Sequence, residues 1–234
     1  MTRRLGTEAT RLKMKGSVFV LMMLAGAGVA LGVACASRGV RTARADTPAG
    51  APAPAQSAEG VGGMLTKEEE ALNQRPLKLP LSQPRVVVEK GARRLRLYAG
   101  GELVRVRQVV LGYEPVADKV RQGDGRTPEG DFQICMKNGK SKFYLSLGLT
   151  YPNAEDAERG LRDGLITQAQ HKSITRALAA GRCPPWNTDL GGEIFIHGGG
   201  TGGDWTLGCV ALENPEIKEL FDILPAGTPV SIRK

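Results

Sequence analysis

The amino-acid sequence predicts a mainly β domain with short helices, preceded by an N-terminal apolar helix and a disordered linker. Three observations favour this fold class. Apolar and polar residues alternate with a period of two from Arg85 onward, Gly and Pro punctuate these runs, and one well-capped amphipathic helix lies near the end of the chain. Because residues 46–84 lack this alternation, we assign the folded core to a single domain over residues 85–234, a length that suits one hydrophobic core.

Residues 1–45 predict a membrane anchor or a signal segment. Residues 17–36 carry no charge and are almost all apolar, a length that spans a bilayer as a helix and slightly favours an uncleaved anchor. The small-x-small sequence Ala43-Arg44-Ala45 keeps a cleaved signal open as the alternative. Eight Lys or Arg and one Glu give this segment +7 of the net charge of +8. The positive charge therefore belongs to the segment that sets membrane topology and does not indicate a nucleic-acid-binding surface. The remaining chain is expected outside the cytoplasm.

Residues 46–84 are expected to form an Ala/Pro/Gly-rich linker and a short spacer. The first part, up to residue 63, has almost no large apolar residue and cannot bury a core, which predicts a disordered tether. Thr66 and Glu69 then form a capping-box pattern that opens a short helix. Three prolines, at positions 76, 80 and 84, end it before the domain begins.

Within the domain, strands are expected at residues 86–89, 95–98, 103–111, 132–136, 143–149, 194–197, 209–212 and 230–232. Turn signals at Lys90-Gly91 and Gly100-Gly101 join the first three into an antiparallel meander. Helical pieces are expected at residues 154–162, 173–180 and 215–224. The last is the clearest, since Asn214 can cap it, a proline follows, and it has one apolar face, made of Ile217, Leu220, Phe221 and Leu224.

Residues 194–214, which read IFIHGGGTGGDWTLGCVALEN, carry the candidate chemistry. A short apolar strand ends in His197, a glycine-rich loop follows, and Cys209 comes next in an apolar run. A cysteine attacks as its thiolate, and a histidine within hydrogen-bond reach is the usual way to generate one. The chain has two histidines, and His171 lies in a polar, helical insertion, so His197 is the candidate base.

Two other interpretations compete with a thiol site. A lone His and Cys at loop spacing are more often structural than catalytic, because free cysteines are commonly buried. A zinc site from His197, Cys209, Cys135 and Cys183 is the second alternative, but the short Cys-x-x-Cys or His-x-x-x-His pairs of structural zinc are missing. We therefore expect no metal and no other cofactor.

A resemblance adds to this interpretation. The segment IHGGGTGGDWTLGC is similar to the active-site motif of the L,D-transpeptidase catalytic domain (YkuD-like) family, in particular its branch with Asp-Trp-Thr-x-Gly-Cys (YafK-like). GDGRTPEGDFQI at residues 123–134, YLSLGLTYPN at 144–153 and GTPVSI at 227–232 resemble further family motifs in the same order. The resemblance covers residues 85–234 and implies a mixed β-sandwich or barrel.

The resemblance also implies the roles of single residues. Cys209 would be the nucleophile, His197 its base, and the backbone carbonyl of Gly198 the group that orients the imidazole. Oxyanion or substrate contacts are expected from Gly208, Thr206 and Trp205. The implied substrates are peptidoglycan stem peptides in the periplasm or cell envelope, cut between the L-centre of diaminopimelate and D-alanine. Further partners are a wall-linked protein and, through the N-terminal helix, the inner membrane.

The chain departs from the commonest family pattern, Ser-His-Gly-Cys followed by an apolar residue and Arg. Leu207 replaces the histidine and Ala211 the arginine, which leaves His197 as the only candidate base. Three functions stay open: transpeptidation, which leads; hydrolysis of the same thioester, trimming stems or releasing a wall-linked protein; and a non-catalytic wall-binding module. The sequence also leaves open whether Cys135 and Cys183 form a disulfide or stay as two thiols.

Overall fold

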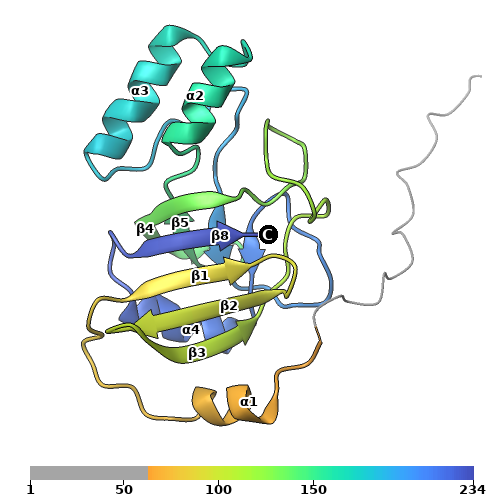
Figure 1. Ribbon diagram of the computed structural model, residues 1–234, viewed down its shortest axis with the longest axis vertical. Coiled ribbons are helices and arrows are strands. Elements are labelled where there is room, and N and C mark those ends of the chain that lie inside the picture. The colour runs from red at the N-terminus through yellow and green to blue at the C-terminus, as the bar shows by residue number, and fades with distance from the viewer. Residues whose placement is uncertain (1–62) are drawn as a thin grey trace, which may run out of the picture. The chain divides into compact units, whose positions relative to one another are not determined.

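The computed structural model describes residues 63–234, which form one eight-stranded mixed sheet with four short helices (Figure 1). The strand order is β3-β2-β1-β8-β4-β5-β6-β7. The strands are β1 (Arg85–Glu89), β2 (Arg94–Ala99), β3 (Glu102–Gln108), β4 (Gly130–Ser141), β5 (Tyr144–Leu149), β6 (Phe195–His197), β7 (Val210–Ala211) and β8 (Pro229–Arg233). The helices are α1 (Lys67–Asn73), α2 (Ala154–Arg162), α3 (Gln168–Ala179) and α4 (Asn214–Ile223). The predicted fold class, mainly β with short helices, is confirmed.

The expected apolar helix at residues 17–36 and the linker up to residue 62 lie outside the described residues. Within residues 63–234, no helix is long and apolar enough to cross a membrane. The anchor or signal segment therefore stays a prediction.

The sheet closes on itself near the candidate site. The first three strands form the predicted antiparallel meander, whereas β1 pairs with β8, and β6 with β7, in parallel. Beyond the end of β3, Val110 pairs with Ala211 of β7, and Gly112 pairs with Thr206. These two bridges join the first part of the sheet to its last strand, so that the loop before β7 is held from both sides.

The hydrophobic core follows from the alternation along the strands. Every second residue of β1, β2 and β8 is fully or almost fully buried, as the period of two requires (Val86, Val88, Leu95, Leu97, Val230 and Ile232). Helix α4 contributes the predicted apolar face, with Ile217 and Leu220 completely buried. It packs on β5 and β6, and so supports the strand that carries His197.

Helix α1, in the predicted spacer, packs against strand β3. Its predicted capping box is present, because Thr66 Oγ1 accepts from Glu69 N and the Glu69 carboxylate accepts from Thr66 N. Its last residue, Asn73, binds both backbone groups of Val106 in β3, at 2.6 Å to the carbonyl and 2.9 Å from the N–H. Arg96 adds an ion pair to Glu69 at 3.2 Å. Figure 1 shows α1 lying along β3, at the end of the domain opposite α2 and α3.

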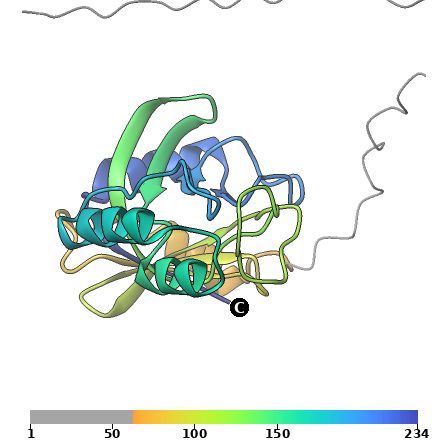
Figure 2. The same ribbon diagram turned by 90° about the horizontal axis from the view of Figure 1, so that it is seen from above.

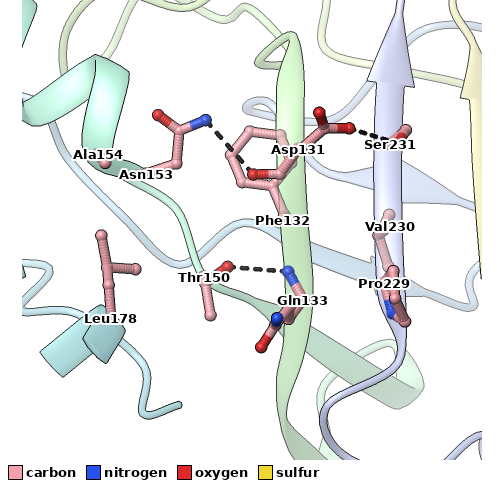
Figure 3. A pocket seen from close by; sticks show the side chains of 10 residues that line it. All are labelled: Asp131, Phe132, Gln133, Thr150, Asn153, Ala154, Leu178, Pro229, Val230 and Ser231. Carbon is pink, nitrogen blue, oxygen red and sulfur yellow. Dashed lines mark hydrogen bonds between the residues drawn. The ribbon is translucent and has the colours of Figure 1, made fainter. Parts of the chain in front are cut away.

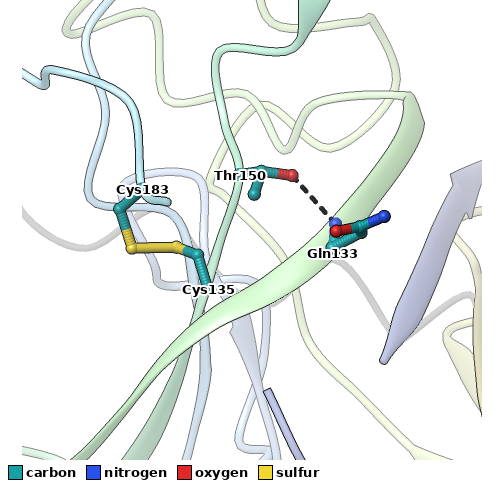
Figure 4. The surroundings of a disulfide bond; sticks show 4 residues. All are labelled: Gln133, Cys135, Thr150 and Cys183. Atoms are coloured by element: carbon teal, nitrogen blue, oxygen red, sulfur yellow. Dashed lines mark hydrogen bonds between the residues drawn. A yellow bond between two sulfur atoms is a disulfide. The ribbon is translucent and has the colours of Figure 1, made fainter. Parts of the chain in front are cut away.

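Helices α2 and α3 form a helical hairpin with a small core of its own, made of Ala157, Ile166, Ile174 and Leu190. A disulfide joins the segment that follows α3 to the sheet, between Cys183 and Cys135 of β4, with 5.2 Å between the two Cα atoms (Figure 4). Of the two alternatives left open by the sequence, the structure shows the disulfide. It also removes both sulfurs from the hypothetical zinc site.

Several element ends differ from the predicted ones. Helix α2 matches, but α3 begins at Gln168, earlier than expected, because Thr167 and Gln170 form a capping box at its start. Strand β4 extends to Ser141, and the two arms of the β4–β5 hairpin reach beyond the rest of the sheet in Figure 2. Asn214 is not the cap of α4: Glu213 takes that position, since the Asn214 side chain binds the glycine-rich loop instead.

Candidate active site

His197 and Cys209 reach the same face of the sheet from neighbouring strands. In the parallel β6–β7 pair, Ile196 lies opposite Val210 and His197 opposite Ala211. Ile196 and Val210 point into the core, so His197 and the residue before Val210, which is Cys209, point to the other side. Continuing this register by one residue places Cys209 opposite Phe195. Cys209 is therefore displaced from His197 by two residues, about 6.6 Å along the strand direction.

The imidazole of His197 is held in one tautomer. Its Nδ1 lies 2.6 Å from the carbonyl oxygen of Gly198. A carbonyl oxygen only accepts, so the neutral ring carries its proton on Nδ1 and keeps the lone pair of Nε2 free. The predicted contact between Gly198 and His197 is therefore present, in the form that a general base needs.

The thiol of Cys209 rests against the segment that leads into β6. Its Sγ donates to the carbonyl of Glu193 and accepts from the N–H of Phe195, both at 3.4 Å. Glu193 has a φ of 55°, unusual for a residue with a side chain. Among the hydrogen bonds of residues 63–234, the expected one between the thiol and His197 is not present. The two-residue offset accounts for this, because the two side chains meet only on a diagonal.

Both groups are neutral at physiological pH. Burial raises the pKa of the Cys209 thiol to about 11, against a smaller lowering by the Phe195 N–H and by the charge of Lys119. Burial also lowers the pKa of His197 below 6.5, and the bond to Gly198 opposes this only in part. The resting pair is thus a protonated thiol and a neutral imidazole, a state from which the base removes the proton during attack.

The turn before Cys209 is shaped by Thr206. Its hydroxyl donates to the Cys209 carbonyl at 2.8 Å and accepts from the Gly208 N–H at 3.1 Å. In this structure the Gly208 N–H is therefore bound to Thr206, and its expected role toward a substrate oxyanion stays a prediction. Thr206 is itself buried, and its expected substrate contact stays a prediction. Among the described residues, the Cys209 N–H makes no hydrogen bond and remains the available donor.

Gly208 is required for a different reason. Its φ is 126°, and a Cβ at this position would lie 2.6 Å from the carbonyl oxygen of Arg126. Arg126 directly precedes the Thr-Pro-Glu-Gly segment (residues 127–130), whose Thr127 hydroxyl donates to the Cys209 carbonyl at 3.4 Å. The ammonium of Lys90, almost fully buried, holds this segment through the Thr127 carbonyl and Glu129, both at 2.9 Å. Sequence reasoning treated Lys90 as a turn signal only.

The Asp-Trp-Thr motif fastens the glycine-rich loop to its surroundings. Asp204 accepts from the guanidinium of Arg93 and, at 2.8 Å, from the Leu111 N–H. The indole N–H of Trp205 donates to the Gly200 carbonyl at 3.2 Å, and its ring meets the His197 imidazole edge to face, with the centroids 5.5 Å apart. Trp205 thus packs beside the imidazole, and 39% of its surface stays exposed.

The N-terminus of α4 holds the other end of this loop. Glu213 Oε1 accepts from the Thr201 N–H at 2.8 Å and from its hydroxyl at 2.6 Å. Asn214 Oδ1 accepts from the Gly199 N–H at 3.0 Å. Sequence reasoning missed both contacts, although the expectation of a helix start at this point could have suggested that its polar side chains bind a neighbouring loop.

A pocket of about 350 Å³ lies away from these residues, between α2, the end of α3 and the strands β4 and β8 (Figure 3). Asp131, Gln133 and Thr150 supply polar groups to its wall, and neither Cys209 nor His197 lines it. No group of three or more His, Cys, Asp or Glu that could hold a metal ion occurs within residues 63–234. His171 lies on α3, outside the candidate site.

Leu207, which stands where the resembled family usually has histidine, is 76% exposed. We expect Leu207→His to change the free energy of unfolding by less than about 1 kcal/mol, because an exposed imidazole keeps its hydration. Thermal denaturation measures this. A midpoint lowered by about ten degrees or more would show instead that the leucine is structural.

Comparisons with known proteins place the chain in a family. The family model of the L,D-transpeptidase catalytic domain matches residues 83–232. No curated protein sequence matches the chain significantly. Among solved structures, Bd1075 from Bdellovibrio bacteriovorus shares 20% identity at a TM-score of 0.43, over 68% of this chain and 51% of its own. The helical cell shape determining protein Pgp2 from Campylobacter jejuni shares 18% at 0.43, over 70% and 54%.

An L,D-transpeptidase from Mycobacterium smegmatis shares 11% identity at a TM-score of 0.39, over 65% of this chain and 59% of its own length. This chain therefore spans between half and three fifths of these three structures. The assignment rests on the family model, which covers well over half of the chain and both candidate residues, Cys209 and His197. The protein belongs to the L,D-transpeptidase catalytic domain family.

Proposed function

We propose that this protein is a cysteine-dependent acyl transferase that acts on peptidoglycan stem peptides. The observation that carries the proposal is the pair formed by Cys209 and His197 on one face of β6 and β7, with the free Nε2 of His197 set by Gly198. A thiol with such a neighbour attacks carbonyl groups. Membership of the L,D-transpeptidase family supports the choice of stem peptides as the acyl donor.

In the proposed reaction, substrate binding turns the thiol from Glu193 toward His197. Nε2 takes the proton, and Sγ attacks the carbonyl between the L-centre of diaminopimelate and D-alanine. The Cys209 N–H donates to the oxyanion, and D-alanine leaves with the proton of the imidazolium. An amine of a second stem then attacks the thioester and releases the thiol, whose proton again passes through His197.

The proposed location is the periplasm or cell envelope, with the N-terminal segment as anchor or signal. The disulfide between Cys135 and Cys183 supports an oxidising compartment, because such bonds are rare in the cytosol. We also propose that the chain belongs to the branch with the Asp-Trp-Thr motif. The proposed domain boundaries lie after residues 45 and 84.

The test is to incubate the full-length chain with purified stem peptides and to identify the products by mass spectrometry. A diaminopimelate-linked dimer of stems supports transfer. A shortened stem without dimer would show that the protein is a hydrolase and not a transferase, since water then hydrolyses the same thioester. Unchanged stems, with no mass of an acyl-enzyme on the intact protein, contradict the proposal. Parallel incubation with Cys209→Ser controls for contaminating enzymes.

A further inference from the structure

Phe143 lies at the tip of the β4–β5 hairpin and is folded back toward the candidate site. Its N–H donates to Ser141 Oγ at 3.1 Å, and its carbonyl accepts from Leu145 N at 3.0 Å. The next residue, Tyr144, has a φ of 72°. A non-glycine residue in this region is costly and persists only where the surroundings require it. Two local hydrogen bonds and this residue thus hold the backbone of Phe143 in a tight turn.

That ring stacks on the imidazole of His197. The ring centroids are 4.6 Å apart and the planes make an angle of 24°. Trp205 closes a three-ring cluster, 5.3 Å from Phe143 and 5.5 Å from His197. His197 is only 2% exposed, whereas Phe143 is 41% exposed. The Phe143 ring thus covers one face of the imidazole and presents its own surface to solvent.

The backbone after His197 approaches the cluster closely at two glycines. A Cβ at Gly198 would lie 2.9 Å from the Phe143 carbonyl oxygen. At Gly199 it would lie 3.3 Å from the Trp205 ring and 3.7 Å from the Phe143 ring. The hairpin is also bonded to this segment, since Gly198 N donates to the Leu145 carbonyl. The stack is therefore a close fit between the hairpin tip and the start of the glycine-rich loop.

The titratable groups near His197 do not account for its protonation state. The segments around His197 carry Cys209 before β7, Lys142 and Tyr144 on the hairpin, Asp204 in the loop and Glu213 at α4. Asp204 is paired with Arg93, and Glu213 is bound by Thr201. The lowered pKa of His197 has burial as its largest cause and is opposed by the hydrogen bond to Gly198. Removal of a side chain that buries the imidazole should therefore change the pKa of His197.

We propose that Phe143 is a positioning residue for His197, whose ring fixes the plane of the imidazole and shields it from water. This rests on the proposed function, in which His197 is the base. The chain lacks a second histidine beside the thiol, because that position is Leu207. A single imidazole must then activate the thiol, so its orientation matters. The hydrogen bond to Gly198 holds the imidazole at one atom only, whereas a ring stacked on its face also fixes its plane.

The test compares Phe143→Ala, Phe143→Tyr and Tyr144→Ala in the full-length chain. Histidine labelled with ¹³C gives two signals, one of which is assigned by its loss in His171→Gln. We expect Phe143→Ala to raise the pKa of His197 toward 6.5, because the charged form becomes hydrated. The acid limb of kcat/KM should move up with it, and kcat should fall about ten- to a hundredfold from misplacement of the base. KM should change little.

Phe143→Tyr keeps the stacked ring and should restore both the pKa of His197 and kcat. Tyr144→Ala is the matched control, because its ring is adjacent and similarly exposed but is not stacked on His197, and this variant should behave like wild type. An unchanged pKa of His197 in Phe143→Ala overturns the inference. So does an equal shift in Tyr144→Ala, which indicates a general loosening of the hairpin. A shifted pKa in a protein that acts on no stem peptide rejects the proposed function and leaves the stacking intact.

Discussion

Replacement of Cys209 by serine should reduce stem-peptide turnover by at least about a thousandfold while the protein stays folded. A hydroxyl has a far higher pKa than a thiol, so a neutral imidazole generates almost no nucleophile from it, and loss of the nucleophile disables the whole catalytic unit. Stability should change little, because sulfur is a weak donor and a weak acceptor and a serine hydroxyl can still donate to Glu193.

Turnover of stem peptides and the thermal midpoint would be measured on the same preparation. Iodoacetamide provides an independent check, since Cys209 is the free cysteine of residues 63–234 and the disulfide protects the other two. Modified wild type should lose activity in proportion to labelling of Cys209. Near wild-type turnover by Cys209→Ser would mean that another group is the nucleophile.

Replacement of His197 by glutamine should lower kcat/KM on the order of 10² to 10⁴-fold, the usual contribution of a positioned general base. The wild type should show an acid limb. The base acts in its neutral form, so activity is present above the pKa of His197 and is lost as the pH falls through it. Because burial lowers this pKa, the limb should lie below pH 6.5.

In His197→Gln the acid limb should vanish from the residual activity. His171→Gln is the matched control, since this histidine lies on α3 and should leave the pH profile as in wild type. The reverse result, with the limb lost in His171→Gln, would transfer the role of base to His171. No limb from thiol ionisation is expected near neutrality, because the pKa of Cys209 is raised to about 11.

The elements of the fold could be predicted because their signals are local. A period of two revealed β1, β2 and β8, and the box formed by Thr66 and Glu69 revealed α1. Ends of elements were predicted less well where a side chain had a distant partner. Asn214 has the chemistry of a helix cap, but its oxygen is taken by Gly199, a contact that only the folded chain creates.

In the candidate site, too, residues with a local signal could be predicted and residues with distant partners could not. His197, Gly198 and Cys209 stand within one motif, and the predicted bond between the first two is present. Phe143 was assigned only to a strand, and nothing in its local sequence indicates that a hairpin tip returns to an imidazole 54 residues further on. The thiol's partners, Glu193 and Phe195, are equally hidden, since the register of β6 against β7 decides them.

The docking of α1 on β3 bears on how the domain can be handled in isolation. β3 stands at one end of the strand order, and a bare edge strand is a template on which a second copy can add a strand and start aggregation. Asn73 occupies the N–H and carbonyl of Val106 as a neighbouring strand would. A fragment that begins at residue 85 would lack α1, so the backbone groups of Val106 would be free to pair with a second copy. A fragment that begins at residue 63 keeps α1 on this strand and should self-associate less.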